Sequence, residues 1–169
     1  MFIKPCVLAT LLTAGLLAGP LALAQNAMPA PASSSSSTPA DLYSSAPRDP
    51  ALKPAFAEFG GKAGLVALVN TFMDNLMADP VTHPFFAPVD RVHVKKELVD
   101  QFCVILDGPC SYHGASMTSI HQGMGVTRAD FNALVVDLQK AMSAHHISFR
   151  AQNKLLAKLA PMGHVIITK

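Results

Sequence analysis

Residues 112–127 read YHGASMTSIHQGMGVT, and this stretch decides which kind of helical fold the chain adopts. Within it, His121 ends what can be only a short helical turn, because Gly123 and Gly125 follow closely. Glycine allows tight turns and close approaches of the backbone, so we expect the histidine to lie on a short, mobile segment. Such a segment leaves room for a large flat molecule in front of the imidazole. A lone histidine near apolar residues is, however, often simply packed in a core.

The sequence on both sides of this stretch has the period of amphipathic α-helices, with apolar residues recurring every three or four positions. The period predicts helices over residues 62–78 and 90–106, one that begins at Thr127, and one over 149–167. Thr127 and Asp130 resemble a capping box, and Pro161 is expected to kink the last helix. No strand-like alternation competes with these helices, so the sequence predicts an all-α domain.

The first 50 residues differ in composition from the rest of the chain. Lys4 precedes an apolar run that ends in Ala22-Leu23-Ala24, the pattern of a secretory signal peptide over residues 1–24. An uncleaved membrane anchor is the alternative. Residues 25–50 are rich in Ala, Pro and Ser and predict a disordered linker, which leaves residues 51–169 as the folded domain. We therefore expect a periplasmic or secreted protein.

The charge of the chain and its cysteines narrow the class of protein. Thirteen Lys and Arg stand against eleven Asp and Glu, which gives no basic face broad enough to bind nucleic acid. Two cysteines, Cys103 and Cys110, follow the predicted signal peptide, one on a predicted helix and one in the turn after it. In an oxidising compartment they form either a disulfide or two separately buried thiols. No second pair accompanies them, so they do not make a zinc pattern.

Four motifs together point to a known family. They are Phe59-Gly60-Gly61, Phe85-Phe86, Asp107-Gly108-Pro109 followed by Tyr112 and Gly114, and the run from His121 to Thr127. Over about residues 54–166 the chain resembles the truncated haemoglobins of the first group, the globins with a two-over-two helical sandwich. The family has Gly-Gly-Pro where this chain has Asp107-Gly108-Pro109, so Asp107 replaces a glycine.

The resemblance implies a haem-binding site with haem b as the cofactor. His121 would be the proximal ligand of the haem iron, and neutral imidazole is a common protein ligand to that metal. The residues that the resemblance places against the haem are Phe86, Val94, Leu98, Phe102, Tyr112, Met117, Phe131 and Leu134.

The chain departs from the family on the distal side of the iron, where gas ligands bind. Met73 and Leu98 stand where the family commonly has a tyrosine and a glutamine, and Val94 stands at the distal gate. None of the three donates a strong hydrogen bond, so the sequence predicts weak O2 binding. Gln101 is the only nearby amide. His93 is expected to point away from the iron.

Three functions remain open at this point. The first is an exported globin that reversibly binds diatomic gases such as O2, NO and CO. The second is an NO dioxygenase or other haem redox enzyme that uses an external electron donor, although an apolar distal side disfavours peroxidase chemistry, which needs an acid-base group. The third is a periplasmic copper binder, with Met117, His121 and Met124 as soft ligands.

Overall fold

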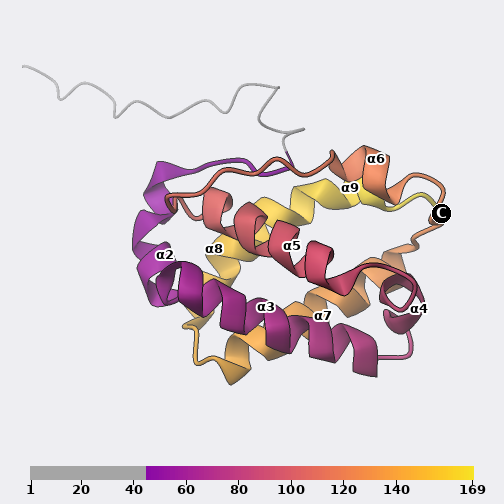
Figure 1. Cartoon of the computed structure of the whole chain (residues 1–169), viewed down its shortest axis with the longest axis horizontal. Coiled ribbons are helices and arrows are strands. Elements are labelled where there is room, and N and C mark those ends of the chain that lie inside the picture. The colour runs from indigo at the N-terminus through magenta and orange to yellow at the C-terminus, as the bar shows by residue number, and fades with distance from the viewer. Residues whose placement is uncertain (1–44) are drawn as a thin grey trace, which may run out of the picture. The chain divides into compact units, whose positions relative to one another are not determined.

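A computed structural model of the chain describes residues 45–169 (Figure 1). The predicted signal peptide and residues 25–44 of the predicted linker lie outside the described residues. In the described part every regular element is a helix, as the sequence predicts. None of these helices is both long enough and apolar enough to cross a bilayer. The short elements are η1 (Pro50–Leu52), α2 (Lys53–Glu58), α4 (His83–Phe86), α6 (Met117–His121), η2 (Ala160–Met162) and α9 (Gly163–Ile166).

Four longer helices build the core of the domain. They are α3 (Gly61–Ala78), α5 (Arg91–Ile105), α7 (Arg128–Ala144) and α8 (Phe149–Leu159). Helix α3 packs against α5 and α7, and both of these also contact α8. Figure 1 shows α3 lying close to both α5 and α7. The apolar period of α3 explains its central place, because its buried residues recur every three or four positions: Leu65, Leu68, Val69, Phe72 and Leu76.

The start of α7 is fixed by the capping box that the sequence predicts. Asp130 N donates to Thr127 Oγ1 at 3.2 Å, and Thr127 N donates to Asp130 Oδ2 at 2.9 Å. The hydrogen bonds from the backbone and hydroxyl of Thr127 hold the pKa of Asp130 below its ordinary value. Two N–H groups that the helix itself leaves without partners are thereby satisfied.

The helix predicted over residues 149–167, with a kink at Pro161, is confirmed as a helical segment that runs without a gap from Phe149 to Ile166. Helix α8 ends at Leu159, a single 3-10 turn follows, and α9 covers only Gly163–Ile166. Pro161 lies at the start of the 3-10 turn, where it lacks the N–H that an α-helix would need. The proline therefore kinks the segment through this 3-10 turn, as the sequence predicts. Beyond the turn, α9 packs beside α6 (Figure 1).

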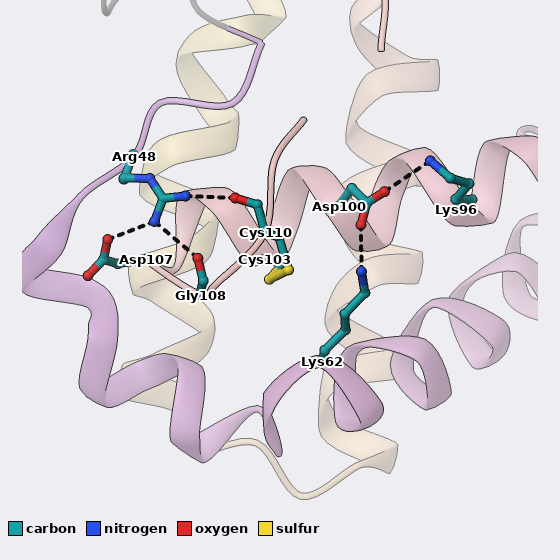
Figure 2. The surroundings of a disulfide bond; sticks show 8 residues. All are labelled: Arg48, Lys62, Lys96, Asp100, Cys103, Asp107, Gly108 and Cys110. Atoms are coloured by element: carbon teal, nitrogen blue, oxygen red, sulfur yellow. Dashed lines mark hydrogen bonds and ion pairs between the residues drawn. A yellow bond between two sulfur atoms is a disulfide. The ribbon is translucent and has the colours of Figure 1, made fainter. Parts of the chain in front are cut away.

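Residues 45–48, before the expected domain boundary at residue 51, pack against the domain. The Arg48 guanidinium donates to Asp107 Oδ1 at 2.9 Å, to the carbonyl of Gly108 at 3.0 Å and to that of Cys110 at 2.9 Å (Figure 2). The hydroxyl oxygen of Ser45 accepts a hydrogen bond from Met117 N at 2.9 Å. Composition alone assigned these residues to the linker, because hydrogen bonds to distant loops leave no pattern in the local sequence.

A disulfide joins Cys103 and Cys110, with their Cα atoms 5.9 Å apart (Figure 2). The sequence left two separate thiols as the alternative, and the structure decides for the disulfide. The bond is feasible because α5 ends at Ile105 and the chain turns back at Asp107. Asp107 has φ of +59°, a left-handed conformation in which glycine is unstrained and aspartate is tolerated.

Candidate functional site

A cavity of about 370 Å³ lies among α5, α6, α7 and the C-terminal turns. Its lining is mostly apolar and aromatic, with aliphatic side chains from α5, α7 and α8 and aromatic ones from α4 and α7. This composition is typical of sites that bind a large apolar ligand. The structure brings together around the cavity all the residues that the sequence placed against haem: Phe86, Val94, Leu98, Phe102, Tyr112, Met117, Phe131 and Leu134. Their contact with haem stays a prediction.

The exposure of α7 shows which part of that helix faces the cavity. Leu138 and Met142 are fully buried in the protein core. Phe131 and Leu134, one to three turns earlier, are apolar but only half-buried, because they line the cavity. The same helix therefore lines the cavity from Phe131 as far as Leu138, which also belongs to the core, and serves the core alone at Met142.

His121 is held on a short helix, as the sequence predicts. Helix α6 begins after Ser116, whose hydroxyl oxygen accepts a hydrogen bond from Ser119 N at 3.1 Å. After the histidine, Gly123 and Gly125 adopt φ values of +78° and +66°, which other residues rarely reach. The glycines allow the chain to leave α6 sharply, so no following helical turn covers the imidazole.

The hydrogen bond of His121 determines which of its ring nitrogens is left for a ligand. Nδ1 lies 2.8 Å from the carbonyl oxygen of Met117. A carbonyl only accepts hydrogen bonds, so Nδ1 carries the hydrogen and Nε2 keeps its lone pair. In metal sites of proteins, the ring nitrogen of a ligating histidine that does not bind the metal regularly donates a hydrogen bond to a protein group. His121 is therefore prepared to ligate a metal through Nε2.

Helix α5 lines the cavity with two adjacent rows of side chains. One row is apolar and consists of Val94, Leu98 and Phe102. The other is polar, with His93, Glu97 and Gln101, each one residue before its apolar neighbour. Residues four apart lie on one face of a helix, so the polar row runs along α5 from exposed His93 to buried Gln101.

Two members of this polar row add to the picture that the sequence predicts. His93 lies at the edge of the cavity, and the expectation that it points away from the iron stays a prediction. Glu97 was not predicted as a site residue at all. The signal that could have found it is its spacing of four residues from both His93 and Gln101, which puts all three on one face of α5.

Glu97 is held with one carboxylate oxygen toward Lys96 and the other in a closed environment. Oε1 accepts a hydrogen bond from Lys96 Nζ at 3.3 Å. Oε2 is buried beside Gly114 and the Tyr112 ring. A Cβ atom at position 114 would clash with Glu97 Oε2 and with the Tyr112 side chain. Burial, together with the negative charge of Glu97, raises the pKa of the Tyr112 hydroxyl above its ordinary value.

The predicted position of Met73 over the iron stays a prediction. Met73 is buried in the core and is not among the residues that line the cavity. Its neighbour Phe72 lines the cavity instead. Successive residues of an α-helix point about 100° apart, so the rotation of α3 that directs Phe72 into the cavity turns Met73 away from it.

Gln101 lies deep in the cavity wall, with 4% of its surface exposed. Its side-chain amide donates a hydrogen bond to the carbonyl of Ser45 and lies 3.8 Å from the sulfur of Met117. The one amide that the sequence offers near the distal side is thus already bonded to the segment before η1.

The chemistry of the donor set fits haem iron better than a metal held by protein ligands alone. Within residues 45–169, no three His, Cys, Asp or Glu side chains are grouped to hold a metal ion. Met117 and Met124 do line the cavity with His121, as the copper hypothesis requires. A porphyrin, in contrast, brings its own nitrogen ligands and needs only one imidazole and an apolar cavity, which this structure provides.

The sequence matches the model of one protein family, described as bacterial-like globin, over residues 54–168. A similar protein is the group 1 truncated haemoglobin GlbN of Mycolicibacterium paratuberculosis. It is 29% identical over 113 residues, which are 67% of this chain and 83% of that protein.

Solved structures show the same fold. The crystal structure of truncated haemoglobin from Tetrahymena pyriformis, in its Fe(III) form, superposes with a TM-score of 0.65 at 24% identity and covers 68% of this chain and 98% of that one. The 2/2 haemoglobin from Synechococcus sp. PCC 7002, in a cyanomet state with covalently attached haem, gives a TM-score of 0.63 at 20% identity and the same coverage.

Proposed function

Because the chain belongs to the bacterial-like globin family, among the group 1 truncated haemoglobins, we propose that it binds haem b through His121 and reversibly binds a diatomic gas. The observation that carries the proposal is the apolar cavity that contains the His121 imidazole, with Nε2 free to ligate. When bound, the haem supplies the iron at which O2, NO or CO coordinates. The protein supplies the imidazole, the apolar surroundings and the groups that discriminate among ligands.

The side chains of α5 favour weak binding of O2 relative to CO and NO. Val94 and Leu98 offer only hydrocarbon to the cavity, and the Gln101 amide is bonded to Ser45. Bound O2 carries partial negative charge and gains from a hydrogen-bond donor, whereas CO gains less. If Val94, Leu98 and Gln101 donate nothing to it, O2 loses a contribution of about 1.5–3 kcal/mol, the value of one charge-assisted hydrogen bond.

The experiment that tests the proposal is a visible spectrum of purified protein, both ferric and ferrous, with and without CO. We expect the intense Soret absorption of haem in the intact protein and its loss or rearrangement in His121→Ala. The matched control is His83→Ala, because His83 also hydrogen-bonds a carbonyl, that of Met77, but does not line the cavity. A His121→Ala protein with unchanged haem spectrum and stoichiometry would contradict the assignment.

We also propose that the protein is exported to the periplasm or secreted. The signal-peptide pattern of residues 1–24 supports this, and so does the Cys103–Cys110 disulfide, because such bonds persist mainly in oxidising compartments. Fractionation of cells and N-terminal sequencing of the recovered protein test the proposal. A protein that keeps residues 1–24 and stays with the membrane would instead be anchored.

A second candidate is a haem redox enzyme, such as an NO dioxygenase, that receives electrons from an external donor. The observation that favours it is Glu97, because it adds a carboxylate to the residues that line the cavity, and haem redox enzymes use polar groups of this kind. Turnover of NO in the presence of O2 and a reductase distinguishes this enzyme from a simple gas binder.

A further inference from the structure

Helix α6, which carries His121, is too short to hold its own position. It covers only Met117–His121, and isolated helices shorter than about 12 residues are marginal in water. The hydrogen bond from His121 Nδ1 to the Met117 carbonyl lies within α6, so it orients the imidazole relative to that helix alone. The place of the imidazole in the cavity therefore depends on contacts between α6 and other parts of the chain.

One of these contacts comes from Ser45, 72 positions before Met117 in the chain. The hydroxyl oxygen of Ser45 accepts a hydrogen bond from Met117 N at 2.9 Å. Met117 is the first residue of α6, and the first N–H groups of a helix have no partner within the helix. Met117 thus bonds Ser45 through its N–H and His121 through its carbonyl, so a single residue links the two contacts.

Ser45 is also bonded to helix α5. Its carbonyl accepts a hydrogen bond from the side-chain amide of Gln101, which is buried in the wall of the cavity. A buried amide that lost this acceptor would be costly, so the contact favours one position of Ser45. Through its hydroxyl and its carbonyl, Ser45 therefore joins the short helix α6 to α5, one of the long helices of the core.

Arg48 fastens the same segment a second time. Its guanidinium bonds one side chain and two carbonyls in the turn after α5, within residues 107–110 (Figure 2). The disulfide ties this turn to α5. The segment 45–48 is thus attached to α5 and the turn after it through both Ser45 and Arg48, which makes it a firm support for α6.

We propose that Ser45 is a positioning residue for the haem ligand, because its hydroxyl fixes where α6 places the His121 imidazole in the cavity. The proposal rests on the proposed function, in which His121 ligates the haem iron. Ser45 lies before residues 54–168, which match the family model, so this support comes from the chain's own segment ahead of the globin domain. Composition assigns that segment to a linker; here it takes part in the haem site.

The test compares Ser45→Ala, which removes the hydroxyl, with Ser45→Thr, which keeps it. Resonance Raman spectra of the ferrous, haem-loaded protein report the iron–histidine stretching band, and transfer of haem to excess apomyoglobin reports the haem dissociation rate. We expect Ser45→Ala to shift or broaden the band and to raise the rate by about 2- to 10-fold, the effect of losing one hydrogen bond of ordinary strength. Ser45→Thr should keep the wild-type band and rate.

The matched control is Ser148→Ala. The Ser148 hydroxyl oxygen also accepts a hydrogen bond from an N–H in the first turn of a helix, that of Ala151 at 3.2 Å, but Ser148 does not line the cavity. Its loss should lower the melting temperature and leave the Raman band and the haem dissociation rate unchanged. Changes in Ser148→Ala as large as those in Ser45→Ala would show that both readouts follow general stability, and would overturn the positioning role.

Amide hydrogen exchange of the haem-free protein distinguishes the possible failures. Exchange of the Met117 N–H should accelerate by about 2- to 10-fold in Ser45→Ala, because the group loses its acceptor. No acceleration, or acceleration with an unchanged Raman band and haem dissociation rate, overturns the positioning role and leaves the gas-binding proposal intact. A folded wild-type protein that takes up no haem overturns the proposed function together with this inference.

Discussion

Asp107 shows how a single side chain offsets a conformation that suits glycine. Its backbone is left-handed, with φ of +59°, at the position where the similar family has glycine. Aspartate is among the few residues that tolerate this region, and here its carboxylate also accepts a hydrogen bond from Arg48. The replacement of the glycine thus gives the turn after α5 an ionic contact that a glycine could not make.

The distal wall offers a residue-scale prediction about O2. Leu98→Gln places an amide donor on a cavity-lining position of α5, so O2 release should slow by about 10- to 100-fold. Release of CO should change much less, because bound CO develops less negative charge. Stopped-flow measurement of both dissociation rates checks the prediction.

Met73→Tyr provides the contrast. Met73 lies in the core, with 4% of its surface exposed, so a tyrosine there should lower the melting temperature and leave O2 release nearly unchanged. If Met73→Tyr slowed O2 release as strongly as Leu98→Gln, the side chain at position 73 would reach the ligand after all.

At the scale of elements, residues 45–48 are expected to stabilise the domain. A protein that begins at Asp49 loses the three hydrogen bonds of Arg48 and the two of Ser45, and it leaves the buried Gln101 amide without its acceptor. We expect it to be less stable by about 1–3 kcal/mol, the cost of one unsatisfied buried group, than a protein that begins at Ser45. Urea unfolding of both proteins measures the difference, and equal stabilities would show that the contacts are incidental.

The sequence predicts some elements well and others poorly, for physical reasons. The helix periods of α3, α5 and α7 and the cap at Thr127 are local signals, and the structure confirms them. The 3-10 form of the turn at Pro161 and the rotation that brings Phe72 to the cavity depend on how the helices pack against one another. The contacts of Arg48 link residues about 60 positions apart, so no local pattern reveals them.

The same distinction applies to the candidate site. His121 could be found from the glycines that follow it, because they restrict the helix locally. Glu97 was missed because, in a list of residues, a glutamate next to two lysines is typical of a solvated helix face. Only the packing of Tyr112 and Gly114 against α5 shows that one of its oxygens is enclosed.

At the scale of the whole molecule, the lowered pKa values of two carboxyl groups predict that the fold loses stability in acid. A hydrogen bond from Lys158 holds the pKa of Asp49 below its ordinary value. Burial alone would raise the pKa of Asp100, but hydrogen bonds from Lys62 and Lys96 outweigh it, so this pKa is also lowered (Figure 2). Such groups stabilise the fold fully above the ordinary pKa of 3.8, and this contribution is lost as the pH falls through the lowered values.

The measurement is the melting temperature of the haem-loaded protein from pH 6 down to about pH 3, at constant ionic strength. In Lys62→Met the pKa of Asp100 should rise toward its ordinary value, so the melting temperature should fall less steeply with acid. An identical pH profile in the variant would exclude this ion pair as a cause.

The disulfide is expected to contribute to the stability of the whole domain. Its cysteines are seven positions apart, and closing so short a loop corresponds to about 2.5 kcal/mol in the chain-entropy model. Unfolding by urea should therefore shift to lower concentration when a reductant is present. A double variant, Cys103→Ala with Cys110→Ala, should not respond to the reductant; a response there would reveal another effect of the reagent.

The bond between Cys103 and Cys110 also bears on how laboratories prepare this protein. Recombinant material made in a reducing cytosol and material recovered after secretion would be two molecules that differ in mass by two hydrogen atoms. Arg48 bonds the carbonyl of Cys110, and Ser45, three residues earlier, accepts a hydrogen bond from the Gln101 amide, so we expect the two preparations to differ at the cavity wall as well. Spectra or gas affinities from different expression hosts should be compared only after intact-mass measurement has established which form each sample contains.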